Sequence, residues 1–149
     1  MIATKKPRPR TPKLPLTDVE RRDLRFARLT LGNVADRSVE ELAAIMDSNQ
    51  ERAQFLKSSA LFQRLDHIGP ETAKDLWVLG YRGYEDLVAA EPARMYEDLC
   101  AVCGVRLDPC VEDSLRLCVA QVRYPDLPDE SLRWWAWSAQ RGQPLRRPG

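Results

Sequence analysis

Residues 61–80 read LFQRLDHIGPETAKDLWVLG, two helical patterns separated by a short turn. Ile68 places one apolar side chain inside the turn, and Gly69 lets the backbone turn sharply without a Cβ clash. Pro70 suits the first position of a second helix, and Gly80 is a typical left-handed helix end. The segment therefore predicts two helices packed against each other as a hairpin.

Helical patterns also fill most of the chain on both sides of this hairpin. Thr17 with Glu20 forms a capping-box signature, and the pair Asp108-Pro109 is a strong helix start. The alternation of apolar and polar residues that marks β-strands is missing. We therefore expect a compact all-α bundle.

The charge is divided unevenly along the 149 residues, a length that suits one domain with a real core. Both ends are basic and rich in proline, which favours an extended, solvated chain. Residues 14–140 hold 15 basic and 22 acidic residues, a formal charge of about −7. The expected organisation is a disordered basic arm (1–15), N-terminal helices that pack on the core (16–59), a helical core (60–123), a C-terminal tryptophan-rich helix (124–140) and a disordered basic tail (141–149).

Several classes of protein are disfavoured by the composition. No run of about 18 apolar residues could span a membrane, and no apolar segment of a secretory signal follows the basic N-terminus. We therefore expect a cytoplasmic protein without a membrane partner, in which the four cysteines are reduced thiols. Because the single histidine, His67, has no evident nucleophile beside it, we expect neither an enzyme nor a cofactor.

The hairpin suggests a way to hold a phosphate backbone. The N-terminus of its second helix presents free backbone N–H groups, which can bind a phosphate without reading sequence. The candidate nucleic-acid-binding residues are His67, Ile68, Gly69, Thr72, Lys74, Arg64 and Arg82 in or near the hairpin, with Lys5, Lys6, Arg8 and Arg10 in the basic arm. DNA is the expected partner.

The turn resembles the helix–hairpin–helix motif, whose turn is usually proline, glycine, an apolar residue and glycine. Here the four residues are Asp66-His67-Ile68-Gly69, so the apolar residue and the second glycine match, and His67 replaces the first glycine. A side chain therefore stands where the backbone would approach a duplex.

Residues 61 to about 138 resemble a bacterial family of helix–hairpin–helix proteins, the pathogenicity-locus or mitomycin-resistance-like proteins. The matching segments are Leu79-Gly80-Tyr81-Arg82-Gly83-Tyr84-Glu85-Asp86-Leu87, Met95-Tyr96-Glu97-Asp98-Leu99-Cys100, Gly104-Val105-Arg106-Leu107-Asp108-Pro109-Cys110 and Arg133-Trp134-Trp135-Ala136-Trp137. The resemblance implies a helical bundle with tandem, SAM-like hairpin units and a link to DNA, and no catalytic activity comes with it. Residues 94–122 would form a second, degenerate hairpin.

The cysteines leave alternatives open. Cys100 and Cys103 have the spacing of zinc ligands, but seven residues separate Cys110 from Cys118, and we expect no metal. Cys118 shares an apolar helical stripe and is expected in the core. Cys110 lies at a helix start, where the helix dipole lowers a thiol pKa, so it is a candidate reactive thiol, with simple packing as the alternative.

Two functions remain at this level. The first is nucleic-acid binding without sequence reading, through the hairpin and the basic tails. The second is a protein-interaction or adaptor module in which the hairpin is purely structural, and the acidic body with the tryptophan segment meets a protein partner. In that segment Leu132 and Trp135 are expected to face the core and Trp134 the solvent.

Overall fold

The computed structural model describes residues 10–147 and is all-helical in that range. The α-helices are α1 (Asp18–Phe26), α2 (Val39–Met46), α3 (Gln50–Phe62), α4 (Pro70–Val78), α5 (Tyr84–Leu87), α6 (Pro92–Cys103) and α7 (Cys110–Arg123), and the 3₁₀ segments are η1 (Leu31–Asp36), η2 (Asp129–Ser131) and η3 (Trp134–Gln140). No β-strand occurs in residues 10–147, so the all-α prediction is confirmed. None of the helices in this range is both long and apolar enough to cross a membrane.

Local signals in the sequence explain where the helices begin and end. The Thr17 hydroxyl accepts from the Glu20 N–H, and the Glu20 carboxylate accepts from the Thr17 N–H, so the expected capping box starts α1. At the start of α3 the cap has one bond only, in which the Asn49 side-chain oxygen accepts from the Arg52 N–H. Gly104 ends α6 in the left-handed conformation, where a side chain would be strained.

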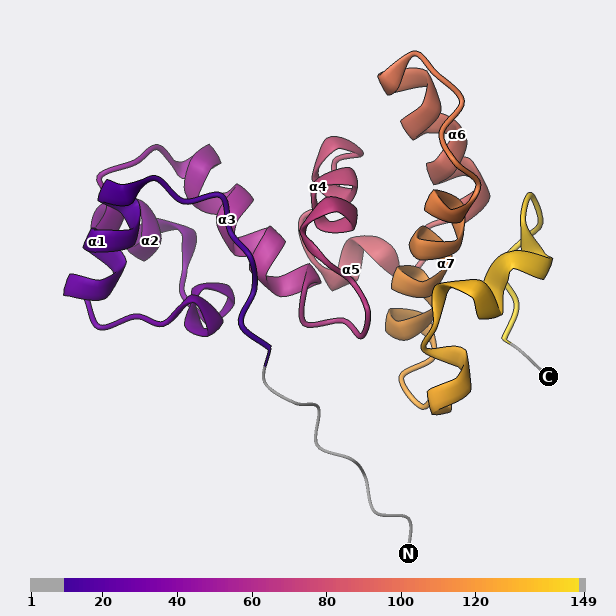
Figure 1. Cartoon of the computed structure of the whole chain (residues 1–149). Helices are drawn as coiled ribbons and strands as arrows, with labels where there is room; N and C mark the ends of the chain where they lie inside the picture. The colour runs from indigo at the N-terminus through magenta and orange to yellow at the C-terminus, as the bar shows by residue number, and fades with distance from the viewer. Residues whose placement is uncertain (1–9, 148–149) are drawn as a thin grey trace, which may run out of the picture.

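Two separate hydrophobic clusters form the core, and α3 contributes to both. The first gathers apolar side chains from residues 14–60, including Leu42 and Leu56, and the second gathers those from residues 62–145, including Phe62 and Leu115. Figure 1 shows α1, α2 and α3 at one end and α6, α7 and the C-terminal segments at the other, with α4 and α5 between them. The sequence predicted a boundary between the N-terminal helices and the core at residues 59 and 60. The helix α3 runs through these residues without interruption, so one helix links the two parts.

The tryptophan-rich segment differs from the prediction in both conformation and orientation. It forms the short 3₁₀ segments η2 and η3 instead of one α-helix. Trp137 is fully buried and donates from its indole N–H to the Ser131 carbonyl, whereas Trp134 and Trp135 are 40% and 55% exposed. The expectation that Trp135 faces the core is therefore wrong, because the tighter 3₁₀ turn of about three residues places side chains differently from an α-helix.

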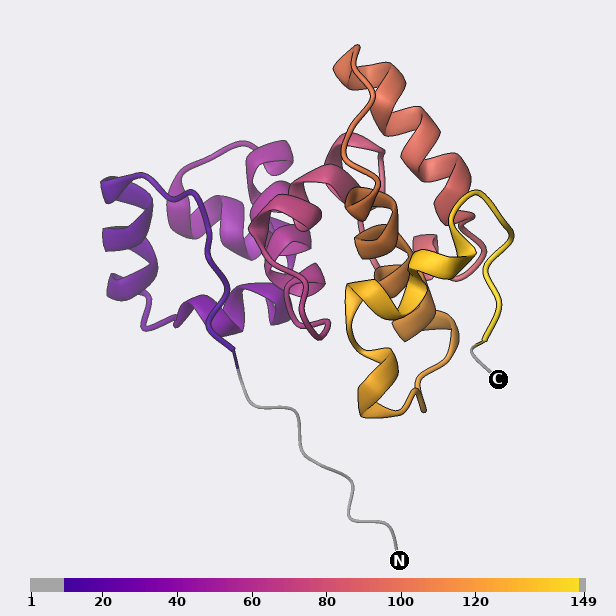
Figure 2. The same ribbon diagram turned by 45° about the vertical axis from the view of Figure 1, so that its right-hand side comes forward.

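The described parts of both basic ends pack on the body, where we expected disorder. Leu14 lies in the first cluster and Leu145 in the second, and both are buried. Arg141 forms an ion pair with the buried Asp113 of α7, which ties the start of the tail to that helix. Figure 2 shows η3, which precedes the tail, lying across α7. Residues 1–9 and 148–149 lie outside the described residues.

Candidate functional site

The turn between α3 and α4 spans residues 63–69 and is built around a buried apolar side chain. Ile68 is buried in the second cluster, as expected. His67, with φ of 59°, adopts the left-handed conformation that the sequence assigned to glycine. Gly69 has an extended backbone with φ of −101°, and a Cβ there would meet nothing within 4 Å. The expectation that Gly69 provides the sharp turn is therefore wrong, because His67 makes that turn.

Two side chains from distant segments fix the shape of this turn. Gln121 of α7 accepts from the Asp66 N–H at 2.8 Å and donates to the Asp66 carbonyl at 3.0 Å. Arg10, from the N-terminal segment, donates to the Leu65 carbonyl and forms an ion pair with the Asp66 carboxylate. The turn is thus held to α7 on one side and to the N-terminal segment on the other.

The N-terminal segment is itself fixed beside the turn. The Gln63 amide accepts from the Lys13 N–H at 2.9 Å and donates to the Lys13 carbonyl at 3.0 Å. The same amide also donates to Ser59, one turn earlier on α3. Residues 10–15 therefore run past the start of α4 in a defined position.

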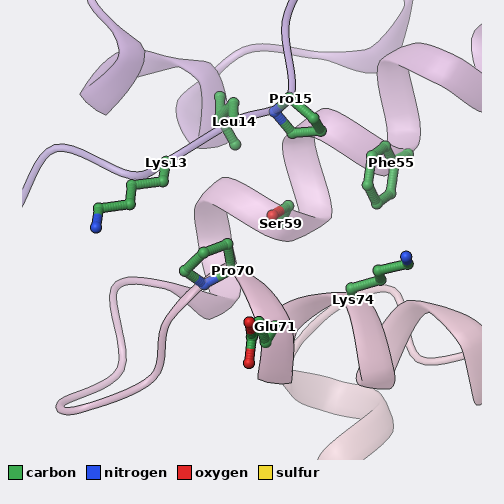
Figure 3. Close-up of a pocket in the computed structure, with 8 residues that line it drawn as sticks. All are labelled: Lys13, Leu14, Pro15, Phe55, Ser59, Pro70, Glu71 and Lys74. Atoms are coloured by element: carbon green, nitrogen blue, oxygen red, sulfur yellow. The ribbon is translucent and has the colours of Figure 1, made fainter.

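A pocket of about 350 Å³ opens between this segment, α3 and the start of α4. Its lining is mostly apolar and consists of Lys13, Leu14, Pro15, Phe55, Ser59, Pro70, Glu71 and Lys74. Figure 3 shows Lys13 and Lys74 extending on opposite sides of the pocket. Within residues 10–147, neither ammonium group has a hydrogen-bond or ion-pair partner, so both are available to an anion.

The start of α4 adds backbone donors beside the pocket. Gly69 is the N-cap of α4, and its carbonyl accepts the first hydrogen bond of the helix, from the Ala73 N–H. Pro70, the first helical residue, has no N–H. The N–H groups of Gly69, Glu71 and Thr72 have no acceptor among residues 10–147. A second pocket of about 270 Å³, lined in part by His67 and Gly69, reaches the same N-terminus from the turn side.

The arginines proposed as phosphate ligands have structural partners instead. Arg64 donates to the Asp36 carboxylate and the Gly32 carbonyl, so it joins the turn to η1. Arg82 stacks on the Trp77 ring with its guanidinium carbon 3.4 Å from the ring centroid, and it also donates to the Trp77 carbonyl. Arg10 is paired as well, so among the proposed lysine and arginine ligands in residues 10–147 Lys74 alone has no partner. Lys5, Lys6 and Arg8 lie outside the described residues.

The carboxylates near α4 limit how positive this region is. Glu71 lines the pocket, and Asp75 lies one turn further along the helix. Burial, followed by the nearby Glu71 charge, raises the pKa of Asp75. The net charge around the pocket is therefore close to zero, and Lys13 and Lys74 are the accessible positive groups there.

The sequence placed Lys13 in the basic arm but did not single it out as a binding residue. Lys13 was counted with the disordered arm, whereas its main chain pairs with Gln63, fifty residues away. A pairing over this distance leaves no local pattern, although Leu14 and Leu16, apolar residues among the prolines, mark where the segment packs on the first cluster.

The second hairpin-like region differs from the first in its turn. Residues 104–109 join α6 to α7, which pack side by side (Figure 1). Val105, at the position that corresponds to the buried Ile68, is 59% exposed, and Leu107 is partly buried instead. The Tyr96 hydroxyl donates to the Leu107 carbonyl and holds this connection against α6.

The cysteines do not gather into a site. Cys100 and Cys118 are buried, Cys103 is exposed, and Cys110 is partly buried, all as free thiols. In residues 10–147 no three histidine, cysteine or carboxylate side chains are grouped to hold a metal ion. The Asp108 carboxylate beside Cys110, helped by burial, raises the pKa of this thiol, so the expectation of a lowered pKa is wrong.

Comparison with known proteins gives one match. Residues 56–143, more than half of the chain, match the model of the pathogenicity-locus family, Cdd1. No curated protein and no solved structure matches the chain. The matched residues contain α4, α5, α6, α7 and almost all of the second hydrophobic cluster, whereas α1 and α2 lie before them. The chain therefore belongs to the pathogenicity-locus family.

Proposed function

We propose that this protein binds nucleic acid, DNA above all, through phosphate contacts that do not read sequence, and that α3, the turn and α4 act as a helix–hairpin–helix. The observation that carries the proposal is the pair of unpartnered ammonium groups, Lys13 and Lys74, on opposite sides of the pocket at the start of α4. The basic residues Lys5, Lys6 and Arg8 precede this segment in the sequence and add positive charge to it.

The start of α4 suits a phosphate for two physical reasons. The unpaired N–H groups of Gly69, Glu71 and Thr72 are donors that a phosphate oxygen can accept from. The helix dipole places partial positive charge at the same end. Lys13 and Lys74 then supply the full charges that neighbouring phosphates require.

The surface around Gly69 supports the close approach of a backbone. A Cβ at Gly69 would meet nothing within 4 Å, so the space next to this residue is open to solvent. His67 is exposed beside it and takes the conformation in which glycine is the usual residue. His67 can therefore take the place of the motif's first glycine in the turn, with its side chain added next to Gly69.

The decisive experiment compares two double variants in a DNA-binding titration at several salt concentrations. Lys13→Gln/Lys74→Gln removes the two pocket ammonium groups, and Arg94→Gln/Arg106→Gln removes two exposed charges on α6 and the connection after it, which do not line the pocket. We expect the first variant to lose at least about tenfold in affinity and to show a shallower salt dependence, by about one unit of slope per lost phosphate contact. Wild-type protein that binds neither DNA nor RNA at low salt would refute the proposal.

A protein-interaction role is the second candidate, and the exposed tryptophans favour it. Trp134 and Trp135 meet edge to face with centroids 5.4 Å apart, and the Arg133 guanidinium lies over the Trp135 ring. Exposed aromatic side chains next to arginine are frequent in protein interfaces. Loss of a co-purifying partner on Trp134→Ser/Trp135→Ser, with DNA binding absent from the wild type, would establish this role instead.

A further inference from the structure

Unpaired guanidinium groups are concentrated in one short stretch of the structure. Within residues 10–147, every arginine outside residues 21–28 has a carboxylate, carbonyl, amide or aromatic partner. Arg21, Arg25 and Arg28 have none, and Arg22 has one long contact of 3.6 Å to Asp23. This stretch is α1 and the residues that follow it, and no candidate residue of the hairpin belongs to it.

The helical period explains why these side chains face the solvent. Glu20 and Leu24, four residues apart, are buried and form the inner face of α1. Arg22 and Arg25 fall on the opposite side, Arg21 lies at the flank, and all three are exposed. Phe26, the last residue of the helix, is 91% exposed among them, although an apolar ring is normally buried.

This combination fits the chemistry of a single nucleic-acid strand. Guanidinium groups bind phosphate oxygens in a bidentate manner, and an exposed aromatic ring offers a face on which an unstacked base can lie. The bases of a duplex are already stacked and do not offer that face. A membrane surface is a poorer fit, because Val19 and Phe26 are the two exposed large apolar side chains of α1, which is too few for insertion.

We propose that the outer face of α1 is a second nucleic-acid contact, which binds the phosphates of a single strand through Arg21, Arg22, Arg25 and Arg28 and stacks one base on Phe26. The ligand class rests on the proposed function, whereas the site itself does not. Lys13 lies five residues before the start of α1, at most about 18 Å of extended chain. One strand of several nucleotides can therefore reach both the pocket and α1. Figure 1 shows the N-terminal segment running past α3 to α1.

The two test variants change side chains of the α1 stretch that have no structural partner within residues 10–147. Arg21→Gln/Arg25→Gln removes two guanidinium groups, and Phe26→Ala removes the ring; Arg94→Gln/Arg106→Gln and Val102→Ala are controls on α6 and the connection after it. Binding of each full-length variant to a single-stranded oligonucleotide and to the matching duplex is measured by fluorescence anisotropy over a range of salt. Circular dichroism melting curves confirm that the variants fold.

We expect the double arginine variant to bind the single strand about tenfold or more weakly, with a salt slope shallower by about 1.4. Phe26→Ala should lose about 5- to 100-fold for the single strand and leave duplex binding unchanged. Wild-type affinity in both α1 variants, with loss in Lys13→Gln/Lys74→Gln, would overturn the α1 site and leave the proposed function intact. Loss in the α1 variants alone would support α1 and count against the hairpin pocket.

Two further outcomes would assign the face of α1 to another ligand. If the arginine variant loses binding to vesicles of anionic lipid, and single-strand binding is unchanged, the face is a membrane contact and the proposal is wrong. If light scattering shows a dimer that Phe26→Ala converts to a monomer, again with unchanged single-strand binding, a second copy of the chain covers this face and the proposal is equally wrong.

Discussion

His67 carries the conformational cost of the turn. Its φ of 59° lies in the left-handed region, which an L-residue other than glycine occupies at a cost of about 1–2 kcal/mol. Histidine tolerates this region better than most residues, yet it has no hydrogen-bond partner within residues 10–147 to compensate. The side chain is exposed, so its replacement leaves the core unchanged.

His67→Gly should therefore raise the free energy of unfolding by up to about 1 kcal/mol, the relief of strain being partly offset by the larger entropy of an unfolded glycine. His67→Ala keeps the strain and should be no more stable than the wild type. Urea denaturation of the three proteins measures the difference. Equal stability of the alanine and glycine variants would mean that this backbone is not left-handed in solution.

Glu20 shows a different kind of single-residue effect, since it is a buried carboxylate that joins α1 to α3. Arg52 donates to both of its carboxylate oxygens at 2.8 and 3.0 Å, and Thr17 donates from its backbone N–H. The hydrogen bonds from Arg52 contribute most to lowering the pKa of Glu20, from 4.5 to about 2. The ionised form is therefore the one that stabilises the folded chain.

This stabilisation should be complete above about pH 4.5 and should be lost as the pH falls toward 2, because the unfolded chain then binds the proton more tightly than the folded chain does. At pH 7, Glu20→Gln should lower the free energy of unfolding by about 1–3 kcal/mol. Near pH 2 the variant and the wild type should converge. Denaturation midpoints followed between pH 2 and 7 test this, and a difference that stays constant with pH would contradict it.

At the scale of the elements, α7 supports the turn through one side chain. Gln121 pairs with both the N–H and the carbonyl of Asp66, which are partly buried and have no other backbone partner in the described part of the chain. The same helix packs against η3 and α6, so the turn is connected to the most buried part of the molecule. The position of α4 relative to the N-terminal segment depends on this connection.

Gln121→Ala should cost about 1–3 kcal/mol, because it leaves two partly buried backbone groups without a partner. Gln121→Glu keeps the acceptor and loses the donor, so its cost should be intermediate. Hydrogen exchange of the Asp66 amide gives the direct readout and should accelerate in both variants, more in the alanine variant. Unchanged exchange at Asp66 would show that the turn is held without Gln121.

The sequence predicted those elements whose signals are local. The capping box at Thr17, the proline that starts α4 and the left-handed Gly80 that follows α4 each act within about four residues of a helix end, so they could be read directly. The 3₁₀ conformation of η3 and the placement of Lys13 beside α4 could not, because both depend on contacts between distant segments, such as Gln63 with Lys13. The unpaired state of the α1 arginines is equally invisible in a sequence, since pairing is a property of the fold.

At the scale of the whole molecule, the two hydrophobic clusters divide the chain near the end of α3. The buried side chains of the first cluster come from residues up to 60, and those of the second come from Phe62 onward. No buried apolar side chain therefore belongs to both clusters within residues 10–147. The family match covers residues 56–143 and thus nearly all of the second cluster, while α1 with its arginines belongs to the first. Polar contacts such as Arg64 with Asp36 and the Tyr84 hydroxyl with the Leu61 carbonyl join the two parts.

Two matched cavity variants can show whether these clusters unfold separately. Leu42 in the first cluster and Leu115 in the second are both fully buried, so each change to alanine should cost about 2–5 kcal/mol. Because no apolar side chain is shared between the clusters, Leu42→Ala should lower hydrogen-exchange protection in α1, α2 and the first half of α3, and leave α6 and α7 protected. Leu115→Ala should lower protection from α4 to α7. If Leu42→Ala instead lowers protection equally along the whole chain, the polar contacts at the end of α3 couple the two clusters into one cooperative unit, and the single strand proposed to span α1 and the pocket would then meet a rigid surface.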